Sequence, residues 1–139
     1  MLLLIDGHNL IGQMPDIDLA DPHDEAKLVL RLRRYRAHTG HRITVVFDGG
    51  IPAGWSANLS TGGVEVVFAG ERKTADAVIV GRIRRHRDPR SVVVVSTDRA
   101  VAEAARRRGA RVIPATAFAR ELTQLGSAPE PEVGDEDLD

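Results

Sequence analysis

Cysteine is absent from the 139-residue chain. Its absence excludes disulfide bonds, thiolate-bound zinc and cysteine nucleophiles, and it fits a reducing compartment. Long hydrophobic runs are missing too, since none approaches the roughly 20 residues that a membrane-spanning helix needs. The apolar start at 1–5 has neither a basic leader nor a cleavage site. We therefore expect a soluble, cytoplasmic protein without a membrane partner.

Common nucleotide-binding and hydrolytic motifs are missing as well. The chain has no Gly-Lys-Ser/Thr phosphate loop and no G-x-G-x-x-G motif after a strand, which excludes nucleotide sites built on those loops. No nucleophile elbow supports Ser-His-Asp hydrolysis. The five histidines do not show the spacing of metal ligands. The chemistry of the chain must therefore be carried by other residues.

Lysine is scarce, and acidic residues crowd the end of the chain. Only Lys27 and Lys73 are lysine among the 19 basic residues, so the chain is rich in arginine. This suits bidentate phosphate contacts, although a GC-rich genome produces the same bias. Residues 127–139 hold six acidic and no basic side chains, which leaves a net charge of +5 on residues 1–126. We expect one domain over 1–126 and a disordered acidic tail over 127–139.

Apolar runs alternate with amphipathic stretches through the whole body of the chain. This alternation predicts an α/β fold with a doubly wound, mainly parallel sheet of about five strands. A long glycine-containing loop is expected between the second and third strands, up to residue 63. The expected strands are 2–5, 43–47, 64–68, 92–96 and 111–113, and the expected helices are about 24–38, 74–86, 98–108 and 115–124.

Four aspartates lie at or just beyond the ends of four predicted strands. They are Asp6, Asp48, Asp76 and Asp98. Because the carboxyl ends of parallel strands meet at one edge of a sheet, we expect these side chains to converge. Carboxylates in such company raise one another's pKa unless a cation lies between them. The pattern predicts a site for Mg²⁺ or Mn²⁺ and points to phosphodiester chemistry.

Each aspartate also has a purely structural explanation. Asp6 and Asp48 precede glycine, as in ordinary Asp-Gly turns, and Asp98 is well placed to cap the helix that follows it. Asp76 would complement the dipole at the start of its helix. It also lies at helical spacing from Ile79 and Ile83, so a carboxylate occupies the stripe that should face the sheet. A charge placed there needs a partner.

Other polar residues near this edge are candidates for supporting roles. His8 adjoins the aspartates, and an orienting or packing role is expected for it. Arg72 and Lys73 lie just before Asp76, whereas the arginines on the helices at 24–38 and 74–86 are first interpreted as a solvated face. The basic cluster at 106–108 fits the end of a helix dipole. Trp55 would either stack on a base or pin its loop.

Six segments of the chain carry a likeness to a known family, namely Leu4-Ile5-Asp6-Gly7-His8-Asn9-Leu10-Ile11-Gly12, Asp24-Glu25-Ala26, Val45-Val46-Phe47-Asp48, Glu65-Val66-Val67-Phe68, Lys73-Thr74-Ala75-Asp76 and Ser96-Thr97-Asp98. Together they resemble the NYN group of PIN-like nucleases, and within it the YacP-like proteins. The resemblance implies a PIN-like three-layer α/β/α fold and a divalent-metal site at the four aspartates. It also implies endoribonuclease activity linked to mRNA turnover on ribosomes. Longer YacP-like chains continue into a basic helical extension, whereas here residues 127–139 are acidic.

The combined hypothesis is a metal-dependent endoribonuclease. The four aspartates would hold one or two Mg²⁺ or Mn²⁺ ions, Asn9 and Thr97 would orient those ligands, and Arg72, Lys73 and Arg99 would neutralise the RNA backbone. Two alternatives remain open. The first is an RNA-binding module that does not cut. The second is a small-molecule phosphatase or phospho-acceptor domain, which would need a nucleophilic aspartate with a lysine partner at a strand end. No lysine follows the strands at 92–97 or 111–113. Nothing in the sequence predicts the oligomeric state.

Overall fold

A computed structural model describes residues 1–52 and 62–126 of the chain. The predictions for Trp55 and for the 127–139 tail concern residues outside these ranges. In the described part no helix is long and apolar enough to cross a membrane.

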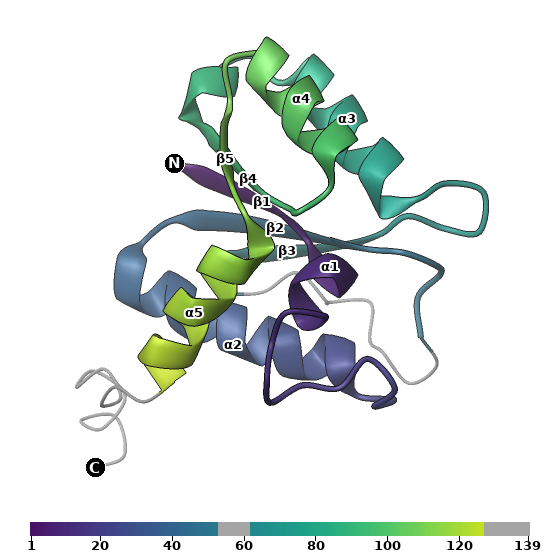
Figure 1. The fold of residues 1–139 in the computed structure, drawn as a ribbon, viewed down its shortest axis with the longest axis vertical. Coiled ribbons are helices and arrows are strands. Elements are labelled where there is room, and N and C mark those ends of the chain that lie inside the picture. The colour runs from purple at the N-terminus through teal and green to yellow at the C-terminus, as the bar shows by residue number, and fades with distance from the viewer. Residues whose placement is uncertain (53–61, 127–139) are drawn as a thin grey trace.

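Five parallel strands form one sheet in the order β3-β2-β1-β4-β5 (Figure 1). The chain therefore builds outward from β1 in one direction and then returns to the other side of β1 with β4. The gap between β1 and β4 is a topological switch point, where open α/β sheets commonly bind ligands. The strands are β1 (Leu2–Asp6), β2 (Arg42–Phe47), β3 (Val64–Phe68), β4 (Val92–Val95) and β5 (Arg111–Ile113).

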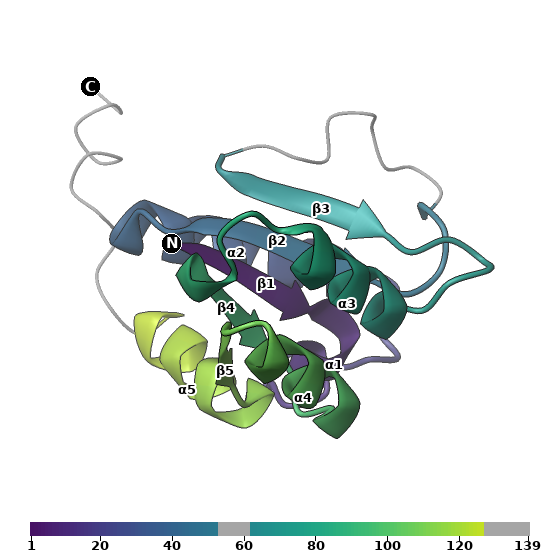
Figure 2. The same ribbon diagram turned by 90° about the horizontal axis from the view of Figure 1, so that it is seen from above.

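Helices cover both faces of the sheet, so the fold has three layers (Figures 1 and 2). Helices α3 and α4 pack against each other over one face, and α1, α2 and α5 pack over the opposite face. A short 3-10 helix, η1, precedes β4. The bounds are α1 (Gly7–Ile11), α2 (Asp24–Thr39), α3 (Ala75–Arg85), η1 (Pro89–Ser91), α4 (Arg99–Arg107) and α5 (Ala115–Gly126).

The central strands are apolar on both sides because both of their faces are covered. In β1, Leu3 and Ile5 pack into the core under α1, α2 and α5, whereas Leu4 packs into the core under α3 and α4. This alternation follows from the two-residue period of a strand. It explains why β1 and β4 appear in the sequence as continuous apolar runs.

The predicted α/β architecture and its five parallel strands are confirmed, but the segment after β1 was predicted wrongly. No helix was expected between the strand at 2–5 and the helix at about 24–38, and the structure has the five-residue helix α1 beginning at Gly7. Gly7 lies against Phe47, so closely that a Cβ atom there would be 2.3 Å from the ring carbon Cε1. Glycine is required by this close packing, and not by a turn. A helix this short carries too little periodic sequence to be recognised.

A candidate acidic site at the carboxyl edge of the sheet

Asp6 ends the central strand and is buried, with 5% of its surface exposed. Burial, and after it a hydrogen bond with Asp76 and the charges of Asp76 and Asp48, together raise the pKa of the Asp6 carboxyl from an ordinary value of 3.8 to about 7. A hydrogen bond from the backbone near Asn9 acts in the opposite direction. Asp6 therefore holds a proton near neutral pH in the metal-free protein, in close contact with a second carboxyl group.

Asp76 lies in the first turn of α3, and the side chain of Thr74 caps that helix by accepting a hydrogen bond from the Ala77 N–H at 3.1 Å. The pKa of Asp76 is raised by burial and by the charges of Asp98 and Asp48, while its hydrogen bond with Asp6 lowers it. Ile79 is fully buried below it on the same helix. The predicted carboxylate on the sheet-facing stripe is present, and it faces other carboxylates.

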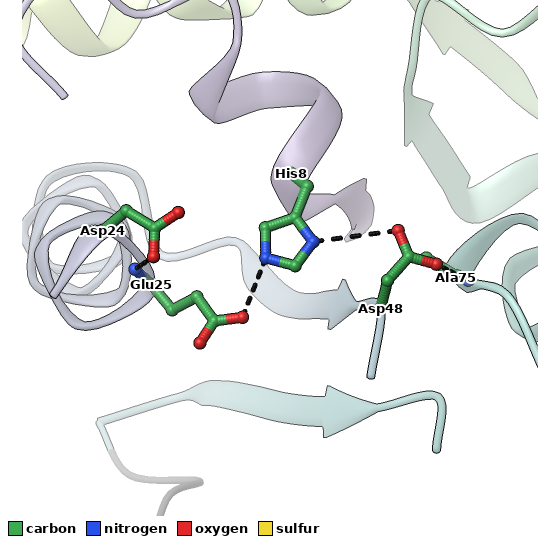
Figure 3. A network of polar contacts seen from close by, with 5 residues as sticks. All are labelled: His8, Asp24, Glu25, Asp48 and Ala75. Carbon is green, nitrogen blue, oxygen red and sulfur yellow. Dashed lines mark hydrogen bonds and ion pairs between the residues drawn. The ribbon is translucent and has the colours of Figure 1, made fainter. Parts of the chain in front are cut away.

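Asp48 follows β2 and reaches two other elements (Figure 3). Its Oδ1 accepts a hydrogen bond from the backbone N–H of Ala75 at 2.7 Å, which fixes it to the start of α3. Its Oδ2 lies 3.7 Å from Nδ1 of His8. About half of the Asp48 side chain is exposed, so it remains open to solvent and to ligands.

Asp98 caps α4, which confirms the structural role that the sequence predicts for it. Its Oδ1 accepts a hydrogen bond from the Val101 N–H at 3.0 Å, and its own N–H donates to Ser96 Oγ at 3.0 Å. The second carboxylate oxygen is not used by the cap. The charge of Asp98 still acts on Asp76, so the two residues are neighbours. Asp98 therefore caps α4 and also belongs to the group of interacting aspartates.

His8 and Glu25 form a pair beside the aspartates, and of the two only His8 is expected from the sequence to have a role near this site (Figure 3). Nε2 of His8 is 2.8 Å from Oε2 of Glu25, and the His8 ring packs on Phe47 with ring centres 5.2 Å apart. The pKa of Glu25 is raised by burial, against the lowering effect of His8. An orienting role was expected for His8. Glu25 is not among the site residues that the sequence predicts, although it lies in the Asp24-Glu25-Ala26 segment that carries part of the family resemblance.

Asn9 and Thr97 meet across the switch point. The Asn9 side-chain amide donates to Thr97 Oγ1 at 2.7 Å, and the Thr97 N–H donates to Asn9 Oδ1 at 2.9 Å. These two bonds join α1 to the segment that follows β4. Both residues are predicted from the sequence to lie near the aspartates, and in the structure they also form hydrogen bonds with each other. Their influence on any ligand stays a prediction.

The three basic residues predicted to contact RNA lie at the starts of α3 and α4. Arg72 and Lys73 precede α3, and Arg99 is the first residue of α4. All three side chains are exposed. None of them forms an ion pair with another residue in the described ranges. They are therefore free to meet a phosphate group at this edge.

The residues at this edge suit a hard divalent cation. Among the described residues no three acidic or histidine side chains are already gathered as tightly as the ligands of a metal. Four carboxylates nevertheless influence one another, and the pKa values of Asp6 and Asp76 rise for that reason among others. Oxygen donors of this kind are what Mg²⁺ and Mn²⁺ prefer. A cation there would remove the repulsion that these pKa shifts record.

An open α/β sheet with acidic side chains at its switch point is the arrangement of a PIN-like, NYN-type domain, a class of nuclease type. The model of the YacP-like NYN domain family matches residues 3–136, so the chain belongs to that family.

Two kinds of relative support this assignment. The protein YacP of Bacillus subtilis, described as uncharacterized, is 39% identical over 79 residues, which cover 54% of this chain and 46% of that protein. The match thus spans about half the length of the curated relative. The crystal structure of Rae1 (YacP) from Bacillus subtilis has a TM-score of 0.75 and 27% identity, covering 91% of this chain and 76% of that one. A variant of the same protein gives a TM-score of 0.70 over 91% and 77% of the two chains, also at 27% identity.

Proposed function

We propose that the protein is a divalent-metal-dependent endoribonuclease that hydrolyses RNA phosphodiester bonds. The observation that carries the proposal is the mutual influence of Asp6, Asp48, Asp76 and Asp98, which come from four separate elements and meet at one edge of the sheet. Carboxylates that raise one another's pKa are costly for stability, so their convergence indicates a functional site. Membership of a nuclease-type domain family supports the same conclusion.

The four aspartates would hold Mg²⁺ or Mn²⁺. Such an ion, when bound, supplies positive charge to phosphate oxygens and a water molecule of lowered pKa. Asp6 and Asp76 must lose their shared proton to serve as ligands. Asp48 and Asp98 each keep one oxygen on a helix N–H and offer the other, so α3 and α4 fix where these two ligands stand.

The neighbouring residues would orient the ligands and the substrate. His8 stands between Glu25 and Asp48, so its ring would help to orient the Asp48 carboxylate. Asn9 and Thr97 hold α1 against the segment that carries Asp98. Arg72, Lys73 and Arg99 would neutralise phosphates on either side of the bond that is cut. The products would carry a 5′ phosphate and a 3′ hydroxyl.

Messenger RNA is our proposed substrate, with turnover on the ribosome in the cytoplasm as the setting. This part of the proposal rests on what the resemblance to the YacP-like proteins implies, and not on a feature of the site. Mapping transcript 5′ ends in cells with and without the protein tests it. New 5′ ends that depend on the protein and on translation are the expected result.

An RNA-binding module without cleavage is the second candidate. It is favoured by one observation, that no three of the described acidic or histidine side chains are already arranged as metal ligands. A phosphatase or phospho-acceptor function is less well supported, because the residues that follow β4 and β5 include no lysine near the edge, and Lys73 is exposed.

A cleavage assay separates the first two candidates. The full chain is incubated with 5′-labelled single-stranded RNA in chelator, in Mg²⁺ and in Mn²⁺. We expect cleavage only with metal and its loss in Asp6→Asn. The matched control is Glu103→Gln, which removes an exposed carboxylate from the middle of α4, outside the site, and should cut normally. RNA binding with no cleavage under any metal condition would favour the binding module.

A further inference from the structure

A second charged surface lies at the opposite edge of the sheet. Helices that connect parallel strands run back across the sheet, so α3 and α4 both end at the amino edge, where the strands begin. The Arg108 side chain donates from Nη2 to the backbone oxygen of Arg84 at 3.3 Å, which joins the two helix ends. Eight exposed arginines gather around this junction. These amino-edge arginines are Arg84, Arg85, Arg87, Arg90, Arg106, Arg107, Arg108 and Arg111.

These arginines are not neutralised by other described side chains. None of the eight forms an ion pair within the described ranges. Arg82, which lies beside them on α3, is different, because it pairs with Glu65 at 3.0 Å. Asp88 is the single acidic residue within 84–91 and 106–111. The amino edge is therefore a strongly positive surface.

Completion of the helix dipoles does not account for a charge of this size. The end of a helix carries about half a negative charge, so α3 and α4 together would be balanced by about one positive charge. Eight arginines far exceed that amount. Keeping so many like charges together opposes folding through self-repulsion, which a polyanionic ligand would relieve.

A hollow opens beside the arginines and combines apolar and basic walls. It has a volume of about 330 Å³ and lies between the end of α3 and the first residues of β1 and β4. Leu2, Ile83 and Val92 form its apolar part, and Arg85 and His86 lie at its basic part. An unpaired nucleotide, which joins a flat base to a phosphate, has the same combination of surfaces.

We infer that the amino edge is a docking surface for the phosphate backbone of single-stranded RNA, separate from the acidic site. The inference rests on the proposed function in one respect, namely that RNA is the ligand. Arginine forks bind phosphate oxygens bidentately, which suits this role. The four steps of β1 from Leu2 to Asp6 separate the two edges by about 13 Å, at about 3.3 Å per strand residue. That distance exceeds the screening length of about 8 Å at physiological salt, so charges at the amino edge have little effect on RNA held at the acidic site. The arginines must therefore contact the RNA directly to influence its binding.

Equilibrium binding in chelator tests the surface independently of cleavage. The full chain is titrated against a fluorescein-labelled 20-nucleotide RNA at several salt concentrations. In Arg87→Gln/Arg106→Gln we expect binding to be roughly tenfold weaker at low salt. The slope of log affinity against log salt concentration should be smaller by about 1.4, which is about 0.7 for each phosphate that is no longer neutralised. The matched control is Lys27→Gln/Arg120→Gln, which removes the same charge from exposed positions elsewhere and should change the affinity far less.

The other outcomes overturn the inference. Equal weakening in the two double variants would show that only the net charge of the protein matters. Unchanged binding in Arg87→Gln/Arg106→Gln would show that RNA does not touch the edge. Polyglutamate and unlabelled RNA are also compared as competitors at equal concentrations of charge. If polyglutamate displaces the labelled RNA at the lower concentration, the surface binds an acidic protein instead.

Cleavage measured on the same proteins separates this inference from the proposed function. We expect Asp48→Asn to bind RNA in chelator as the parent does while losing cleavage. We expect Arg87→Gln/Arg106→Gln to raise KM and leave kcat nearly unchanged. A parent protein that binds RNA through the arginines but never cuts would overturn the proposed function and leave the docking surface standing.

Discussion

The Asp48 carboxylate accepts the backbone N–H of Ala75 at 2.7 Å, so a residue of the candidate site also holds the first turn of α3 in place. The structural and the chemical roles of Asp48 belong to different properties of the side chain. The hydrogen bond to Ala75 needs only an oxygen acceptor, whereas metal binding needs the charge.

Two substitutions at Asp48 should therefore behave differently. Asp48→Asn keeps an acceptor for the Ala75 N–H and removes a charge that repels Asp6 and Asp76. We expect it to abolish cleavage and leave the metal-free protein equally stable or more so. Asp48→Ala should also lose cleavage and cost about 1 kcal/mol, as the loss of a helix-capping acceptor does. Urea unfolding in chelator measures the difference, and normal cleavage by Asp48→Asn would remove this residue from the site.

Asp76→Asn tests whether the carboxyl in the first turn of α3 is a ligand or a dipole complement. As a ligand, its replacement should abolish cleavage and the rise in melting temperature on addition of Mg²⁺, with metal-free stability equal or higher. As a dipole complement, the same change should cost roughly 0.3–1 kcal/mol and leave cleavage intact. Thermal melting with and without metal, combined with RNA cleavage, distinguishes the two because the stability changes have opposite signs.

The stability of the metal-free protein should fall as pH rises toward neutrality. The folded-state pKa of Asp6 is about 7 against an ordinary value of 3.8, so folding favours its protonated form. Its contribution is therefore complete below about pH 4 and is lost as pH rises through about 7. Urea unfolding in chelator at pH 5 and pH 8 should show the decline, and Asp6→Asn should reduce it. An identical pH dependence in the parent and the variant would contradict the assignment.

Removal of the polar groups of His8 should impair activity more than folding. His8→Phe keeps a ring beside Phe47 and takes away the ring nitrogens that face Glu25 and Asp48. We expect metal affinity or cleavage to fall roughly 10–100-fold, as is usual when a residue that orients a ligand is replaced. Metal titration and cleavage rates measure this, and the melting temperature reports on the fold. Activity equal to that of the parent would restrict His8 to packing.

Gly7→Ala should destabilise the protein because a Cβ atom there would come within 2.3 Å of Phe47. Overpacking of this kind costs about 1–3 kcal/mol. Gly50→Ala is the control, since its added Cβ atom would have no neighbour within 4 Å. Urea unfolding of the two variants should differ accordingly, and equal stabilities would show that the Phe47 ring can move aside.

The sequence predicts the centre of the sheet well because β1 and β4 are continuous apolar runs covered on both faces. Val92–Val95 is such a run, and its position in the sheet follows from that composition. The convergence of the four aspartates could also be predicted, since it depends only on where parallel strands end.

Contacts between distant side chains could not be predicted in the same way. The bond between Asp48 and Ala75 joins residues 27 positions apart, and it depends on how α3 docks against β2. The pairing of His8 with Glu25 depends on where α2 begins relative to α1. Sequence patterns report the period of each element and not its docking angle, so the partners of individual site residues emerge only from the structure.

The hydrogen bonds that Asp48 and Asp98 accept at the starts of α3 and α4 bear on how this domain can evolve. Replacing either aspartate by asparagine would keep the capping oxygen while removing a ligand charge, and a single nucleotide change in an aspartate codon suffices for it. Loss of cleavage would then entail no loss of the fold. Under the proposed function, descendants that keep the fold and bind RNA without cutting it are therefore one mutational step from an active ancestor.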